Sequence, residues 1–321
     1  MSHTIRTTTA AEAAAAAAIR PASGTTVPVV LTIAGSDPTG GAGLQADLKT
    51  IHALGLYGMS VTTALTAQHS SRFDTMFPIS YGTVLAQLHA VMEECTPDAI
   101  KIGMVGSADT ARELAYDLRR VTAPIVLDPV GRATLDEIGS SALTLTHALN
   151  DLLPLATIVT PNLPEAAELT GITIDSEEAA IMAGEMILDM GPRHVLIKGG
   201  HDERDPEWVT DLLVTPEGTY RFTTPRIAAP PRVRGTGCTL SSAIACYLAR
   251  GQKVPDAVHH AKEYLHGAIA QAVAANNEPT LSSLTRSASS LNTHARVPVA
   301  HDWMQRNASS TPSLHTGTET P

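Results

Sequence analysis

Residues 28–54 read PVVLTIAGSDPTGGAGLQADLKTIHAL, and this stretch contains the unit from which the rest of the chain is built. Its first part, Pro28–Ala34, is aliphatic and β-branched, which favours a buried strand. A glycine-rich loop, Gly35–Leu44, follows, and apolar residues then recur at helical spacing over Gly43–Leu54. The stretch therefore predicts a strand, a glycine-rich turn and a helix.

The same alternation continues to about residue 275. Further strands are expected at Ser60–Ala67, Ala99–Val105, Pro124–Asp128, Thr157–Thr160, His194–Lys198, Asp211–Val214 and Thr219–Phe222. Helices are expected at Gly82–Glu94, Ala108–Arg120, Ser140–Leu153, Ser176–Met190, Thr239–Arg250 and Pro255–Ala274. Strands that alternate with helices predict an α/β domain with a mostly parallel central sheet flanked by helices. Ligands of such sheets bind beyond the carboxyl ends of the strands.

Composition narrows the possible functions. The chain has 321 residues, of which 43% are apolar and 17% charged, and its formal net charge of -10 argues against a nucleic-acid partner. Its three cysteines are too few and scattered for a disulfide framework, and no apolar run reaches the ~18 residues of a membrane span. We expect a cytoplasmic protein with a disordered leader at 1–27, one domain at 28–275 and a mostly disordered polar tail at 276–321.

The strongest local motif is Arg234-Gly-Thr-Gly-Cys-Thr-Leu-Ser-Ser242, which opens a predicted helix. Gly235 and Gly237 would let backbone N–H groups converge on an anion, and the helix dipole would assist. The same dipole is expected to lower the pKa of the Cys238 thiol. A glycine turn that merely starts a buried helix, with a small apolar Cys, is the alternative.

Asp47 lies on the apolar face of the first predicted helix. An inward carboxylate is costly unless it is paired or used on a ligand, so both a ligand contact and a structural bond to a neighbouring loop stay open. The preceding loop contains Gly41-Ala-Gly-Leu-Gln-Ala46, a G-x-G-x-x-A pattern. A dinucleotide-binding site is disfavoured because the motif does not directly follow the strand and no acidic residue stands near Val61–Thr63.

Polar residues follow three further strands. Asp128, Asn162 and Glu165 carry oxygen ligands of the kind that Mg²⁺ prefers, although Asp-Pro is also a turn former and Asn162 with Glu165 could form a helix-capping box. Lys198 would place an ammonium at the same edge, where it could neutralise a phosphate. The chain lacks the Walker A motif, which excludes a P-loop kinase.

Together these residues resemble the hydroxymethylpyrimidine/phosphomethylpyrimidine kinases. The resemblance covers about residues 28–272 and is carried by six motifs in order: Ala34–Lys49, Thr63–Gln68, Lys101–Met104, Thr160–Ala166, Lys198–Gly200 and Gly235–Ser241. It implies a ribokinase-like three-layer sandwich, usually a homodimer, that uses ATP and Mg²⁺. The implied reaction phosphorylates 4-amino-5-hydroxymethyl-2-methylpyrimidine and then its monophosphate.

The resemblance also implies roles for individual residues. The pyrimidine pocket would be lined by Gly35, Asp47, Gln68, Met104 and Val130. Cys238 would act as base beside the hydroxymethyl group, with Gly235, Thr236 and Gly237 around the phosphate, Lys198 on the phosphates, and Asp128, Asn162 and Glu165 organising Mg²⁺.

Departures from the family pattern leave the substrate open. Arg234 stands where the family usually has His, and Gly131-Arg-Ala-Thr134 replaces the common Met-x-x-Lys. Arg132 and Arg234 are either ligands of a substrate phosphate or exposed loop residues. A pyridoxal or pyridoxine (vitamin B6) kinase is the main alternative function. A non-catalytic pyrimidine-binding protein is disfavoured by the joint presence of Lys198, Asn162, Glu165 and Cys238.

Overall fold

A nine-stranded sheet forms the centre of the protein, described here from a computed structural model. The structure describes residues 27–69, 72–130, 149–202, 204–227 and 235–275. The strand order is β3-β2-β1-β4-β5-β6-β7-β8-β9. Neighbouring strands from β2 through β1, β4, β5 and β6 to β7 pair in parallel. At one edge β3 pairs antiparallel with β2, and at the other β8 pairs antiparallel with β7 and β9.

The strands are short at the centre and long at the sides of the sheet. They are β1 Val29–Ser36, β2 Tyr57–His69, β3 Arg72–Pro78, β4 Ala99–Ile102, β5 Ile125–Leu127, β6 Ile158–Val159, β7 Val195–Ile197, β8 Trp208–Thr215 and β9 Gly218–Pro225. The central strands are buried along their whole length, as expected for parallel strands covered on both faces.

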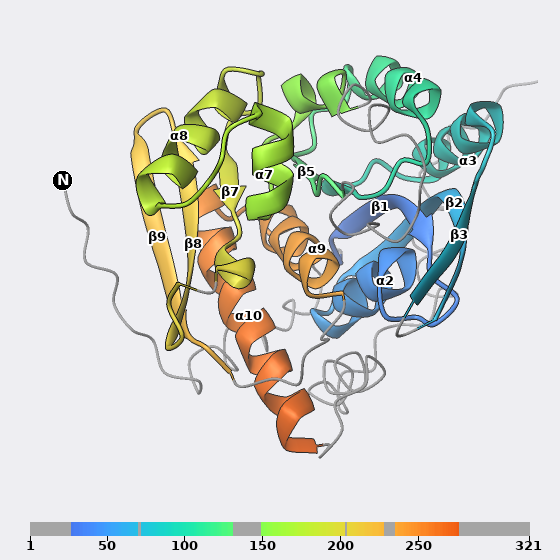
Figure 1. Cartoon of the computed structure of the whole chain (residues 1–321). Coiled ribbons are helices and arrows are strands. Elements are labelled where there is room, and N and C mark those ends of the chain that lie inside the picture. The colour runs from blue at the N-terminus through green and yellow to red at the C-terminus, as the bar shows by residue number, and fades with distance from the viewer. Residues whose placement is uncertain (1–26, 70–71, 131–148, 203, 228–234, 276–321) are drawn as a thin grey trace, which may run out of the picture.

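Helices cover both faces of the sheet, which gives three layers (Figure 1). One face packs against α3 Tyr81–Glu94, α4 Ala108–Leu118, α7 Leu163–Thr170 and α8 Glu177–Leu188. The other packs against α2 Gly43–Ala53, α9 Thr236–Ala249 and α10 Val254–Ala275. Side chains alternate along β1, so that Leu31 and Ile33 belong to the first apolar core and Val30 belongs to the second.

The predicted α/β architecture is confirmed, with a strand, an α-helix and the short 3-10 helix η2 Gly199–His201 that were not predicted from the sequence. Strand β3 lies at the edge of the sheet with β2 as its single neighbour, and none of its residues is fully buried. It therefore lacks the apolar run by which buried strands are recognised. Helix α7 has only eight residues, too few for a clear period, and its capping box was the one signal of it.

Some boundaries differ from the expected ones. Helix α9 begins at Thr236 rather than Thr239, so the glycine motif itself forms its first turn. Most of the helix predicted at Ser140–Leu153 lies outside the described residues, as do residues 1–26 of the expected leader at 1–27 and the whole expected tail at 276–321. None of the described helices combines the length and apolarity of a membrane span.

Helix α4 offers a direct test of the core on the first face of the sheet. Leu114 is 0% exposed, whereas Tyr116 on the same helix is 63% exposed. We expect Leu114→Ala to lower the free energy of unfolding by about 2–5 kcal/mol, because it removes buried contacts and leaves a cavity. Tyr116→Ala is the matched control and should change it by less than about 0.5 kcal/mol. Urea unfolding measures both, and equal losses would contradict this packing.

Candidate active site

A cavity of about 840 Å³ lies at the carboxyl ends of the parallel strands. Its volume is in the range of small-molecule sites. It is lined by every residue that the sequence analysis assigned to the site except Asp47: Gly35, Gln68, Met104, Asp128, Val130, Asn162, Glu165, Lys198, Gly235, Thr236, Gly237 and Cys238. Arg132 and Arg234 lie outside the described residues.

The order of strands in the sheet divides the cavity lining. Gly35, Gln68, Met104 and Val130 follow or belong to β1, β2, β4 and β5, on one side of the sheet. The other side is lined from β8, β9 and α10, by Val209, Asp211, Thr224, Pro225, Lys262, Leu265, His266 and Ile269. Lys198 follows β7, which lies between β5 and β8 in the sheet, and the start of α9 also lines the cavity. The two groups of lining residues are therefore joined by Lys198 within one cavity.

Two glycines shape the start of α9. Gly235 has φ +75°, and a Cβ on it would lie 1.9 Å from the carbonyl oxygen of Gly41, so only glycine fits there. A Cβ on Gly237 would lie 3.4 Å from Lys198 Nζ and 3.6 Å from Asp128 Oδ2. The missing side chain therefore leaves space beside these two charges. The described residues provide no side-chain cap for α9, so its first N–H groups remain available to an anion.

Lys198 is held between two carboxylates. Its Nζ lies 2.8 Å from Asp128 Oδ1 and 3.8 Å from Glu165 Oε2. Burial disfavours the charged form of Lys198, but Asp128 and Glu165 outweigh it and raise the pKa of the ammonium. Burial likewise opposes ionisation of Asp128, whereas Lys198 and then Lys101 lower its pKa. Both groups are therefore charged at neutral pH.

Asn162 and Glu165 form the capping box of α7, one of the two roles open from the sequence. The Asn162 side chain accepts from the Glu165 N–H, and Glu165 Oε2 accepts from the Asn162 N–H, both at 2.8 Å. Among the described residues, no three His, Cys, Asp or Glu side chains are grouped to hold a metal ion directly. The oxygen-rich pair Asp128 and Glu165 nevertheless fits a hydrated Mg²⁺ bound through water beside a phosphate.

Asp47 is not part of the cavity lining, contrary to the expectation that it lines the pyrimidine pocket. It is 0% exposed, and its carboxylate accepts from Lys101, Thr32 and Ser242. The inward position was correctly expected, but the bonds formed are to buried protein donors. Among these three donors, Lys101 is the one that lines the cavity.

The pKa of Cys238 also differs from the expected direction. Burial raises the pKa of the thiol, and Asp47 and Asp128 add to this. Lys101 and a backbone hydrogen bond with Gly43 act in the opposite direction but do not compensate, and the pKa rises to about 11. The expectation of a lowered pKa was wrong because it considered the helix terminus and not the loss of solvent.

Several cavity residues were not found from the sequence. They are Asp37, Arg72, Phe73, Lys101, His201, Asp211 and Lys262. Lys101 had the clearest available signal, because a lysine within the otherwise apolar strand Ala99–Ile102 must be paired. Asp37 organises the first glycine loop, since its carboxylate accepts from the Thr39 and Ala42 N–H groups.

Comparison with known proteins identifies the family of the chain. The sequence profile of the phosphomethylpyrimidine kinase family matches residues 37–281. The hydroxymethylpyrimidine/phosphomethylpyrimidine kinase of Streptomyces coelicolor is 45% identical over 244 residues, which cover 76% of this chain and 89% of the relative. The Escherichia coli protein of the same name is 43% identical, over 75% and 91% of the two chains.

The chain belongs to the phosphomethylpyrimidine kinase family. Solved structures of this fold agree. A phosphomethylpyrimidine kinase from Clostridium difficile superposes with a TM-score of 0.63 at 40% identity, over 75% of this chain and 99% of the other. A Staphylococcus aureus pyridoxal kinase in complex with ADP superposes with a TM-score of 0.69 at 35% identity, over 77% and 89%. The phosphomethylpyrimidine kinase family member described here is thus a phosphotransferase of ribokinase-like fold.

The raised pKa of Cys238 predicts low reactivity toward alkylating agents. At pH 8 we expect iodoacetamide to modify Cys238 roughly tenfold more slowly than free N-acetylcysteine, because far less thiolate is present at the protein site. The rate should continue to rise above pH 9, as the pH approaches the raised pKa of about 11. Peptide mapping by mass spectrometry separates Cys238 from Cys95 and Cys246. A rate that levels off below pH 8 would contradict this electrostatic environment.

Proposed function

We propose that the protein transfers the terminal phosphoryl group of ATP to the hydroxymethyl group of 4-amino-5-hydroxymethyl-2-methylpyrimidine, and then phosphorylates the resulting monophosphate. The names of the most similar relatives support the substrate. The observation that carries the proposal is the single cavity in which Gln68 and Met104 occur together with Lys198 and the start of α9.

The pyrimidine would bind at the end formed by β1, β2, β4 and β5. Gln68 offers an amide that can both donate to and accept from an aminopyrimidine. Met104 provides apolar contact, and its position requires Gly35, because a Cβ on Gly35 would lie 2.4 Å from Met104 Cε. This arrangement would direct the hydroxymethyl arm of the ring toward Cys238.

The nucleotide would extend from Lys198 toward β8, β9 and α10. Apolar residues on these elements, such as Val209, Leu265 and Ile269, suit a purine ring. The backbone N–H groups of Gly235, Thr236 and Gly237 and the Lys198 ammonium would surround the transferring phosphoryl group. Phosphoryl transfer depends mainly on positioning and charge neutralisation, and these groups supply both.

Magnesium and the thiol complete the proposal. Asp128 and Glu165 would hold Mg²⁺ through water, with Asn162 keeping Glu165 in place, and the bound ion would supply further neutralisation of phosphate charge. Cys238, in its thiolate form, would receive the proton of the hydroxymethyl group. Because its pKa is about 11, the thiol requires the cations around it to stabilise the anionic form during transfer.

A vitamin B6 kinase is the second candidate. It is favoured by the pyridoxal kinases among the solved structures that resemble this chain, one of them in complex with pyridoxal. Pyridoxal also carries a hydroxymethyl arm on a six-membered aromatic ring. The higher sequence identity to the pyrimidine kinases places this candidate second.

We further propose a cytoplasmic homodimer. The three cysteines Cys95, Cys238 and Cys246 are free, which suits a reducing compartment. Leu65 and Phe77 are cross-strand partners on β2 and β3, yet they are 52% and 59% exposed. An apolar pair of this kind at an edge of the sheet suits contact with a second copy, which sedimentation of the purified protein tests.

A coupled ATPase assay tests the choice of substrate. We expect kcat/KM for the hydroxymethylpyrimidine to exceed that for pyridoxal at least about tenfold, since the Gln68 amide matches the aminopyrimidine edge and an unpaired polar group is costly. The pyrimidine monophosphate should also be phosphorylated. Faster turnover of pyridoxal would favour the B6 kinase instead.

Replacement of Cys238 tests the proposed proton acceptor. We expect Cys238→Ala to lower kcat about 100-fold, the size of effect typical of lost general base catalysis. The Kd for ATP should stay within about threefold, because the side chain does not contribute to the phosphate-binding backbone. Steady-state kinetics and calorimetry give the two values, and an unchanged kcat would remove Cys238 from the mechanism.

A further inference from the structure

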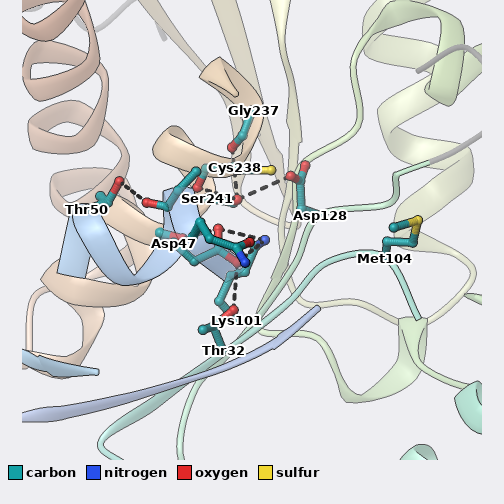
Figure 2. Close-up of polar contacts among 12 residues, drawn as sticks. Thr32, Asp47, Thr50, Lys101, Met104, Asp128, Gly237, Cys238 and Ser241 are labelled. Atoms are coloured by element: carbon teal, nitrogen blue, oxygen red, sulfur yellow. Dashed lines mark hydrogen bonds and ion pairs between the residues drawn. The ribbon is translucent and has the colours of Figure 1, made fainter. Parts of the chain in front are cut away.

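A buried cluster of charges lies directly under the cavity. Lys101 on β4 and Thr32 on β1 are register partners, and both point to the face of the sheet that α2 and α9 cover. Asp47 on α2 meets them there, with its Oδ2 2.8 Å from Lys101 Nζ and 2.6 Å from Thr32 Oγ1 (Figure 2). Lys101 and Asp47 are both 0% exposed.

The donors around Asp47 come from three different elements. Its Oδ1 accepts from Lys101 Nζ at 3.0 Å and from Ser242 Oγ of α9 at 2.9 Å. The carboxylate thus receives four hydrogen bonds and is shielded from the cavity. A buried ion pair contributes little net stability relative to well-packed apolar residues. The presence of this pair therefore calls for a role other than stability.

Lys101 is the member of the cluster that reaches the site. It lines the cavity although no part of it is exposed to solvent. A Cβ on Gly103 would lie 2.7 Å from Lys101 Nζ, so the absence of a side chain there leaves room for the ammonium. Burial opposes its charge, but Asp47 outweighs burial and raises the pKa of Lys101, so the ammonium stays protonated. Its charge also acts on Cys238 and Asp128.

Two cations therefore act on Cys238 from different strands. Lys198, at the end of β7, belongs to the group around the transferring phosphate. Lys101, on β4, lies next to β1 and β5, the strands whose ends hold Gly35 and Val130. The two ammonium groups are thus divided between the nucleotide half and the acceptor half of the cavity.

We propose that Lys101 is a positioning residue that stabilises the thiolate of Cys238 and the negative charge that passes to the accepting oxygen during phosphoryl transfer, and that Asp47 favours the reaction by holding Lys101. In this step the Cys238 thiol first loses its own proton to solvent, and the thiolate then takes the proton of the acceptor as the acceptor O–H bond breaks. The oxygen bonds to the terminal phosphorus of ATP as the bond to the bridging oxygen breaks, releasing ADP. The inference rests on the proposed function for the identity of the acceptor.

A double-mutant cycle tests this role. We expect Lys101→Met to slow single-turnover transfer about 100-fold and Asp47→Asn about tenfold, in the range found when an electrostatic stabiliser is lost. The double variant should be no slower than Lys101→Met alone, since Asp47 has no cation to hold once Lys101 is gone and its own charge opposes the Cys238 thiolate. Calorimetry should find Kd values for acceptor and nucleotide within about threefold of those of the unaltered protein, which separates loss of rate from loss of structure.

Thr32→Val is the matched control. It removes a hydrogen bond from the same buried carboxylate but leaves both charges, so the transfer rate should change less than about threefold. If Lys101→Met does not fold because it leaves Asp47 unpaired, the double variant, which buries no net charge, carries the test.

Two results would overturn the inference. One is a transfer rate near that of the unaltered protein in Lys101→Met or in the double variant. The other is a loss of about 1,000-fold in the double variant, the product of the single losses, because Asp47 would then act independently of Lys101. Transfer is measured with whichever ring alcohol the unaltered protein phosphorylates, so a wrong choice of pyrimidine would leave this test intact.

Discussion

The charge balance beneath the cavity depends on the buried contact between Asp47 and Lys101. This contact joins α2 to β4, and the Thr32 and Ser242 hydroxyls extend it to β1 and α9. Four elements therefore meet at one carboxylate. Through Ser242, the helix α9, whose start lines the cavity, is linked to this carboxylate. Hydrogen bonds and ion pairs have preferred distances and angles, which apolar packing lacks. A buried charged cluster therefore suits a site whose groups must be held at fixed distances from one another.

The sequence predicted the site residues that directly follow strands. It did not predict contacts between residues that are distant in the chain. Residues that directly follow strands, such as Gln68, Met104 and Lys198, could be placed at one edge because parallel strands end together. Asp47 could be assigned to the buried face of its helix, but its partners come from strands and helices up to 195 residues away. No local pattern shows which donor will fill such a space.

The thiol of Cys238 shows the same limit in electrostatics. A helix terminus can be inferred from the sequence, and it lowers the pKa of a thiol. Desolvation depends on how completely other elements cover the side chain, and here it dominates. The edge strand β3 and the short helix α7 were missed for a related reason, since each is stabilised by neighbours rather than by its own periodicity.

The close approach of Gly235 to Gly41 also bears on how the molecule is assembled. These residues are distant in the chain, and all nine strands precede the start of α9. The sheet can thus form without this turn, and the contact with Gly41 then closes only the connection from β9 to α9. An activity assay would therefore report whether this turn is in place, which the secondary structure of the sheet alone does not show.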